Sequence, residues 1–220
     1  MPQPPPTVIL DEPSARLRDA VAAFAPVYVF KASRGFLSSP FLAAEELPGA
    51  LAAAGMAPPY VFVAASFGGF AALAYASRWP ATLAGLVLVD ASHPEQGATA
   101  LAAIPPDAPA TPALAAFKQR LRGFGPVWTE GCAAIARITQ LGDIPLVVLA
   151  AGQPDMPAEL GAATGDALTR GWHELQRRHA ALSSRGELRI VPGAGHDLVR
   201  LAPDAVLAAI RELLDRWADS

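Results

Sequence analysis

The stretch YVFVAASFGGFAALAY, residues 60–75, decides the fold because it predicts a buried strand, a tight turn and a helix in immediate succession. Residues 60–64 are an apolar run of strand-forming side chains, and the helical spacing that follows the turn stops at Pro80. The turn carries Ser66, and such a geometry presents a serine hydroxyl above the edge of a sheet. The small neighbours Gly68 and Gly69 allow the helix to lie close against the strand.

Length and composition favour a single enzyme-sized domain that acts on small molecules. The chain has 220 residues, of which 52% are hydrophobic and 17% are charged, so we expect one domain over residues 1–220 with a full core. The net charge of -3 indicates no basic surface for nucleic acid. The single cysteine, Cys132, excludes an internal disulfide and has no metal-ligand spacing around it, so we interpret it as a small buried side chain.

The sequence carries no signal for secretion or for membrane insertion. The N-terminus MPQPPPTVIL has neither a basic region nor a long apolar stretch, and no apolar run approaches the length of a membrane span. We therefore expect a cytoplasmic protein without a membrane span. Alanine, proline and arginine are abundant while lysine occurs only at Lys31 and Lys118, which indicates a GC-rich, bacterial genome. The oligomeric state stays open.

Alternating apolar runs and helical periods predict a mostly parallel sheet flanked by helices. The predicted strands are residues 7–10, 27–31, 60–64, 84–90, 145–151 and 187–191. The predicted helices are residues 14–24, 42–54, 67–79, 159–183 with interruptions near Gly165 and Gly171, and a last one from Pro203. Residues 84–90 are continuously apolar, which is typical of a strand covered on both faces.

Two segments of this chain resemble the α/β-hydrolase family. AASFGG is similar to that family's nucleophile elbow G-x-S-x-G, with Ala64 in place of the first glycine, and GAGH, residues 193–196, carries a histidine on a glycine loop after the last predicted strand. The resemblance extends in order over residues 7–218, without the family's first two strands. It implies a compact α/β-hydrolase fold of about six mostly parallel strands flanked by helices, with a short helical lid.

The resemblance also assigns a role to the proline-rich segment between the fourth and fifth predicted strands. Residues 91–143 break the alternation and hold short helical pieces around 114–121 and 132–138. The family carries an inserted lid at this position, so we call residues 91–143 the lid segment and expect it to form the acyl pocket. A surface decoration is the alternative. The expected pocket residues are Phe117, Leu121, Phe124 and Trp128.

The order of the polar residues implies a catalytic triad of the same family. Ser66 would be the nucleophile and His196 its general base, because a serine hydroxyl needs a base and the base needs a carboxylate to orient it. Two aspartates follow neighbouring strands, and we prefer Asp155 over Asp90 because a loop residue reaches an imidazole more readily than a strand terminus. A helix cap is the alternative for Ser66.

The other histidines and Asp197 are expected to lie outside the triad. His93 stands at the entrance of the lid segment, and Asp197 would point away from the site. His173 and His179 lie within a predicted helix beside charged residues, so we expect them to be solvated or to cap the helix.

The oxyanion site departs from the family pattern. After the first strand the family has His-Gly, whereas this chain continues with Asp11, Glu12 and Pro13, and a proline has no N–H to donate. The amide of Phe67 is retained by position, and Ser14 or Ala15 is the candidate for the second donor. Loss of one such donor lowers turnover by about 10² to 10³.

The resemblance thus implies a serine hydrolase that cleaves the ester of a small or medium acyl group through an acyl-serine intermediate, with no metal and no organic cofactor. A thioesterase or an acyltransferase would use the same triad. A catalytically degenerate binding module is the alternative from another class, because of the altered oxyanion segment.

Overall fold

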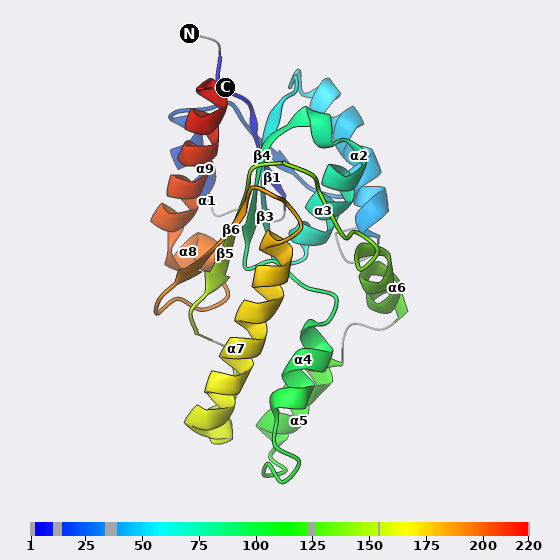
Figure 1. Ribbon diagram of the computed structural model, residues 1–220, viewed down its shortest axis with the longest axis vertical. Coiled ribbons are helices and arrows are strands. Elements are labelled where there is room, and N and C mark those ends of the chain that lie inside the picture. The colour runs from blue at the N-terminus through cyan, green and yellow to red at the C-terminus, as the bar shows by residue number, and fades with distance from the viewer. Residues whose placement is uncertain (1–2, 11–14, 34–38, 123–125, 154, 220) are drawn as a thin grey trace.

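A six-stranded parallel sheet forms the centre of the computed structural model, which describes residues 3–10, 15–33, 39–122, 126–153 and 155–219 (Figure 1). The strands are β1 Thr7–Leu10, β2 Val27–Phe30, β3 Tyr60–Ala65, β4 Leu83–Val89, β5 Leu146–Ala151 and β6 Gly186–Val191. Their order in the sheet is β2-β1-β3-β4-β5-β6, and every neighbouring pair is parallel. Each strand begins and ends within one residue of the predicted range.

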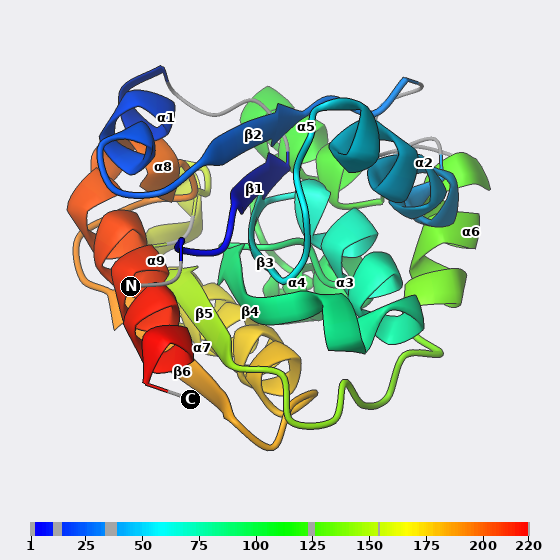
Figure 2. The same ribbon diagram turned by 90° about the horizontal axis from the view of Figure 1, so that it is seen from above.

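Helices cover both faces of this sheet (Figures 1 and 2). The helices are α1 Ala15–Ala22, α2 Pro40–Ala53, α3 Gly68–Arg78, α4 Gln96–Ala103, α5 Pro112–Leu121, α6 Pro126–Ile135, α7 Gly161–Ala180, α8 Leu198–Leu201 and α9 Pro203–Ala218, with short 3-10 helices at Pro80–Thr82 and Ala158–Leu160. Helices α1, α8 and α9 lie on one face, and α2, α3 and α7 lie on the other. Among the described residues, no helix is long and apolar enough to cross a bilayer.

The alternation of side chains along β3 explains why both faces are covered. Val61 and Val63 pack in the cluster of α1 and α9, whereas Phe62 and Ala64 pack in the cluster of α2 and α3. All seven residues of β4 are buried, as expected for a parallel strand between two helical layers. The sheet therefore holds the carboxyl ends of its strands in fixed positions at one edge.

Helix α7 differs from the prediction, because it runs without interruption over 20 residues. The two glycines that suggested breaks are close-packing positions instead. A Cβ at Gly165 would lie 2.7 Å from Met156 Cε, and one at Gly171 would lie 2.8 Å from Thr99 Cγ2 of α4. The glycines allow α7 to approach these neighbours closely, which the local sequence could not reveal.

The lid segment contributes α4, α5 and α6, between β4 and β5. Helix α4 was not predicted, and the helix expected over residues 132–138 is α6, which begins at Pro126 and ends at Ile135. Ile104, Leu114 and Phe117 form a separate small core with Leu160 and Leu168, the latter from α7. Helix α4 thus packs against α7, and α5 packs against α4, beyond the carboxyl ends of the strands (Figure 1).

Candidate active site

Ser66 lies on a sharp turn between β3 and α3. Its backbone has a φ of 48°, in the left-handed region that side chains other than glycine rarely adopt. The turn is held from both sides, because Ser66 N donates to Val89 O at 3.2 Å and Ser92 N donates to Ser66 O at 2.9 Å. A Cβ at Gly69 would lie only 2.6 Å from Ala91 Cβ, so the first turn of α3 needs a glycine here.

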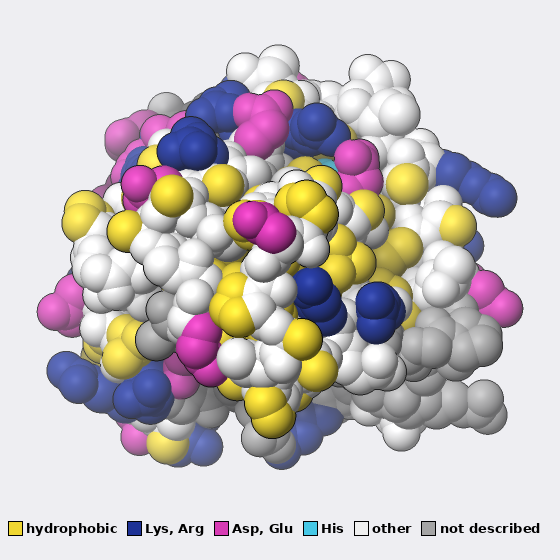
Figure 3. Space-filling model, turned by 90° about the horizontal axis from the view of Figure 1, so that it is seen from below, with side chains coloured by type: hydrophobic (Ala, Val, Ile, Leu, Met, Phe, Trp, Pro, Cys, Tyr) yellow, Lys and Arg dark blue, Asp and Glu magenta, His cyan; other side chains and the backbone are white. Residues whose placement is uncertain are grey.

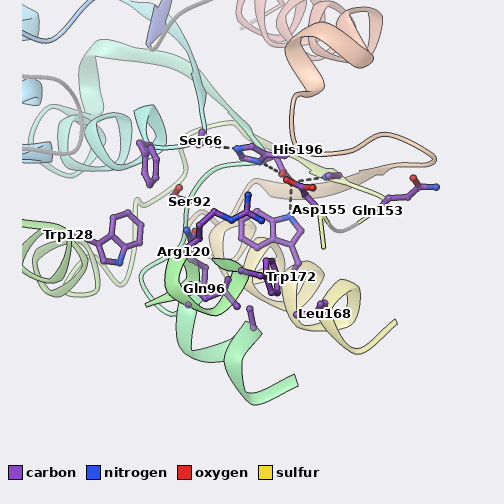
Figure 4. A pocket seen from close by; sticks show the side chains of 17 residues that line it. Ser66, Ser92, Gln96, Arg120, Trp128, Gln153, Asp155, Leu168, Trp172 and His196 are labelled. Atoms are coloured by element: carbon purple, nitrogen blue, oxygen red, sulfur yellow. Dashed lines mark hydrogen bonds and ion pairs between the residues drawn. The ribbon is translucent and has the colours of Figure 1, made fainter. Parts of the chain in front are cut away.

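Ser66, His196 and Asp90 are joined by two hydrogen bonds (Figure 4). His196 Nδ1 lies 2.7 Å from Asp90 Oδ2, and His196 Nε2 lies 3.1 Å from Ser66 Oγ. A carboxylate only accepts hydrogen bonds, so Nδ1 carries the ring proton and Nε2 can accept the proton of the serine hydroxyl. The arrangement is able to deprotonate Ser66 as its oxygen attacks an electrophile.

The carboxylate of Asp90 is buried and fully engaged. Its side chain is 3% exposed, and its Oδ1 accepts hydrogen bonds from Ala151 N at 2.8 Å and from Trp172 Nε1 at 2.7 Å. Together with His196, these donors provide three hydrogen bonds to a charge that burial would otherwise penalise. Asp90 has a φ of 45°, so it is the second residue of this group in the left-handed region.

The preference for Asp155 as the partner of His196 is therefore corrected to Asp90. His196 Nδ1 donates its hydrogen bond to Asp90, because the backbone turn after β4 and the two donors to Oδ1 hold the Asp90 carboxylate beside the imidazole. Asp155 lies on the exposed loop after β5 and lines the same pocket. It reaches His196 only as a nearby charge.

The surroundings of His196 favour its protonated form. The hydrogen bond that His196 donates to Asp90 is the largest cause that raises the pKa of His196 above its ordinary value, and the charges of Asp90, Asp155 and Asp197 act in the same direction. Burial opposes them without reversing the shift. Asp197 caps α8 by accepting a hydrogen bond from Arg200 N at 3.2 Å.

A polar stripe on α7 holds the segment that carries Asp90, and the sequence analysis missed it. Trp172 binds the Asp90 carboxylate, His173 Nε2 donates to Ala151 O at 2.9 Å, Gln176 Nε2 donates to Ala91 O at 2.8 Å, and His179 Nε2 donates to Ser92 O at 3.0 Å. These four side chains share one face of the helix. We call Trp172, His173, Gln176 and His179 the α7 stripe. The sequence indicates this stripe only through the helical spacing of residues 172, 176 and 179, which places their side chains on one face.

His179 is buried rather than solvated, contrary to the prediction, and it packs against His93. Its residue is 2% exposed, and the two ring centroids are 4.8 Å apart. Burial, followed by the neighbouring His93, lowers the pKa of His179 to about 3, although the bond to Ser92 acts in the opposite direction. Burial and then the charge of Arg178 lower the pKa of His93 to about 4. Both rings are therefore neutral at neutral pH.

A cavity of about 370 Å³ opens above Ser66 and His196. Figure 3 shows hydrophobic side chains beside Lys and Arg side chains on this face of the molecule. Of the expected lid residues, Phe117, Leu121 and Trp128 line the cavity, and Phe124 lies outside the described residues. Gln96, Ala100, Arg120, Gln153, Leu168 and Trp172 line it as well.

Of the expected oxyanion donors Phe67 and Ser14, only Phe67 belongs to the residues that the structure describes. Phe67 lies at the N-cap of α3, directly after Ser66, so its amide belongs to the positive end of the helix beside the nucleophile. Ser14 lies outside the described residues. Among the residues that the structure describes, no group of three or more His, Cys, Asp or Glu side chains is placed to hold a metal ion.

Comparisons with known proteins agree with this architecture. The model of the Alpha/beta hydrolase family matches residues 9–209. Similar solved structures include a thermophilic esterase from Thermogutta terrifontis, which is 18% identical with a TM-score of 0.58 and 98% and 91% of the two chains covered. An α/β fold family hydrolase from Bacillus anthracis is 12% identical, with a TM-score of 0.58 and coverage of 95% and 91%.

A third similar structure is Est816, described as an N-acyl homoserine lactone degrading enzyme, which is 15% identical with a TM-score of 0.57 and coverage of 94% and 92%. No match to a curated protein was found. At these identities the solved structures support the fold, while the family model covers most of the sequence. The chain belongs to the α/β hydrolase family.

Proposed function

We propose that the protein is a serine hydrolase that cleaves the carboxylic ester of a small or medium acyl group through an acyl-serine intermediate. The observation that carries the proposal is the pair of hydrogen bonds that joins Ser66, His196 and Asp90 at the floor of the cavity. Nucleophile, base and orienting carboxylate lie within the distances that acyl transfer requires. The thermophilic esterase among the similar structures supports this class of substrate.

In the first half of the reaction, Ser66 Oγ attacks the carbonyl carbon of the ester and His196 Nε2 takes the hydroxyl proton. Collapse of the tetrahedral intermediate breaks the bond to the alcohol oxygen, and His196 returns the proton to that oxygen. In the second half, water attacks the acyl-serine by the same route and releases the acid. Asp90 accepts the hydrogen bond from Nδ1 and so keeps the imidazole in the required tautomer.

The oxyanion of the tetrahedral intermediate would be stabilised by the amide of Phe67, which follows the nucleophile at the N-terminus of α3. Ser14 or Ala15 remains the candidate for the second donor. The proposal assigns residues 1–220 to a single domain in which the lid segment sets acyl specificity. A cavity of about 370 Å³ fits a small or medium acyl group, because ligand sites begin at about 300 Å³.

A thioesterase or an acyltransferase would use the same three residues. A thioesterase differs from an esterase in the leaving group, and an acyltransferase differs in the acceptor of the acyl group. A degenerate binding module would retain the fold and lose the reactivity of Ser66. The first test therefore measures the reactivity of the serine itself.

The experiment treats the protein with a fluorophosphonate probe and, separately, with p-nitrophenyl butyrate. We expect the probe to label Ser66 and the ester to be hydrolysed, and Ser66→Ala to lose both while its thermal unfolding stays unchanged. Ser77→Ala is the matched control, because Ser77 lies on α3, where its hydroxyl donates to Ala74 O away from the site. An unlabelled wild-type protein, or a Ser66→Ala variant with hydrolysis within about tenfold of wild type, would refute the proposal.

A further inference from the structure

One cationic side chain enters the cavity from the lid segment. Among the described residues that line the cavity, Arg120 is the only lysine or arginine. It shares one face of α5 with Phe117 and Leu121, which also line the cavity, because residues three and four positions apart are neighbours on a helix. Figure 4 shows the guanidinium directed into the cavity, toward the region of Trp172 and His196.

The guanidinium of Arg120 has no carboxylate partner among the residues that the structure describes. Its contact is with the ring of Phe117, whose centroid lies 5.6 Å from Arg120 Cζ. This contact holds the planar group against the cavity wall and leaves its N–H donors unused. Phe117 itself is buried in the small core of the lid segment, so the ring is a firm support for the cation.

Two further side chains add donors to the same part of the cavity. Gln96 Oε1 accepts from His93 N at 2.9 Å, so the amide nitrogen is the group that Gln96 can offer to a ligand. Ser92, whose side chain carries a hydroxyl donor, also lines the cavity. Figure 4 shows Ser92, Gln96 and Arg120 on the same side of the cavity. An arginine with neutral donors beside it matches the needs of a carboxylate.

The acidic residues of the cavity do not satisfy this arginine. Both oxygens of Asp90 are occupied by His196, Trp172 and Ala151 N. Asp155 lies on the loop after β5, and no ion pair joins it to Arg120 among the described residues. A negative charge on the substrate would be repelled by Asp155 and attracted by Arg120, which orients the substrate as well as binding it.

We propose that Arg120, with Gln96 and Ser92, forms a subsite for a carboxylate, and that the enzyme prefers esters that carry a free carboxylate a few bonds from the scissile bond. The inference rests on the proposed function, because it names the substrate class of that site. The carboxylate belongs either to the acyl part, as in a monoester of a dicarboxylic acid, or to the alcohol part, as in an acylated hydroxy acid.

The kinetic test uses two anionic esters and their neutral amide counterparts of equal shape. Monoethyl adipate places the carboxylate on the acyl side, and 4-acetoxybutanoate places it on the alcohol side. We expect wild-type protein to prefer at least one of them over its amide in kcat/KM. Arg120→Gln should lower kcat/KM for that ester by about tenfold, which lies between the effect of a hydrogen bond to a charged group and that of an exposed ion pair, because Arg120 is exposed, and it should leave the amide within about twofold.

Arg122→Gln is the matched control, because Arg122 ends the same helix and does not line the cavity. It should leave both members of each pair unchanged. Arg120→Lys should keep part of the preference, and rising salt should weaken it. Equal kcat/KM for each ester and its amide, or an equal loss for both in Arg120→Gln, would overturn the subsite.

A binding measurement separates this inference from the proposed function. Calorimetry on Ser66→Ala protein should detect adipate and not adipamide, and Arg120→Gln in the same background should abolish the binding of adipate. If adipate binds through Arg120 while wild type hydrolyses no ester, the proposed function fails and the subsite stands. If wild type hydrolyses both members of each pair equally and adipate does not bind, the subsite fails and the proposed function stands.

Discussion

The indole N–H of Trp172 offers a sharp test of how the acid of this site is held. Trp172 Nε1 donates to Asp90 Oδ1 at 2.7 Å, and Ala151 N provides the only other hydrogen bond that the described residues give to that oxygen. In Trp172→Phe an aromatic ring remains and the donor is lost. A hydrogen bond to a charged group contributes about 1.5–3 kcal/mol, so the buried carboxylate loses roughly that much stabilisation.

Two effects on turnover follow from that loss. A carboxylate with fewer donors attracts the imidazolium more strongly, which raises the pKa of His196 further above its ordinary value. We therefore expect the acidic limb of the kcat/KM profile to move to higher pH. We also expect the plateau to fall by about tenfold, because Asp90 is held by one donor fewer.

The assay is ester hydrolysis by wild type, Trp172→Phe and the control Trp79→Phe over the range in which a histidine titrates. Trp79 packs against Tyr75 with tilted rings and does not line the cavity, so its replacement should leave the acidic limb in place. If Trp172→Phe lowers the kcat/KM plateau without shifting the acidic limb of the pH profile, the indole contributes only packing. In that case the reasoning about the carboxylate is wrong.

Three further predictions address the acid, the base and the buried histidines. Asp90→Asn should lower kcat by orders of magnitude and Asp155→Asn by less than about tenfold, because only Asp90 orients the His196 tautomer; the reverse order in kinetic assays would restore Asp155 as the acid. Turnover should fall as pH drops through a His196 pKa above 6.5, and His196→Gln should remove this limb with most of the activity; a limb that persists in this variant would place the base elsewhere. The pKa values of His93 and His179 are lowered to about 4 and about 3 in the folded protein, compared with about 6.5 in the unfolded chain. The stability that these two residues contribute is therefore fully present above pH about 6.5 and is lost as the pH falls toward the folded-state pKa values. Denaturant titrations should show a loss of several kcal/mol in wild type between neutral pH and pH about 4, and a shallower loss in His179→Gln; equal pH slopes would contradict the burial argument.

The fold could be predicted from the sequence because its signals are local. The apolar runs of the strands and the small residues around Ser66 act over fewer than about ten residues, so periodicity and turn chemistry were sufficient. The order of Ser66, the two aspartates and His196 along the chain then predicted that these residues lie at one edge of a parallel sheet. The cytoplasmic location and the absence of a cofactor stay predictions.

The aspartate that lies against His196 could not be predicted, because it depends on contacts between distant parts of the chain. Asp90 and Asp155 both follow a strand at the correct edge, and they differ in the donors that surround them. The decisive donor, Trp172, lies 82 residues from Asp90 in the sequence. The same limit explains the error at His179, whose charged neighbours on the helix suggested solvent while its ring faces Ser92 O.

The α7 stripe connects two parts of the site that the sequence presents as separate. One face of α7 binds Asp90, Ala91 and Ser92, and Gly171 lets the same helix approach α4 of the lid segment closely. The Asp90 carboxylate and the lid segment are therefore supported by one continuous helix. A break in α7, which the glycines had suggested, would separate these two functions. Because α7 is unbroken, a substitution that shifts α4 against Gly171 should also change the geometry of the hydrogen bond between Trp172 and Asp90. Through Asp90 it should then change the position of His196.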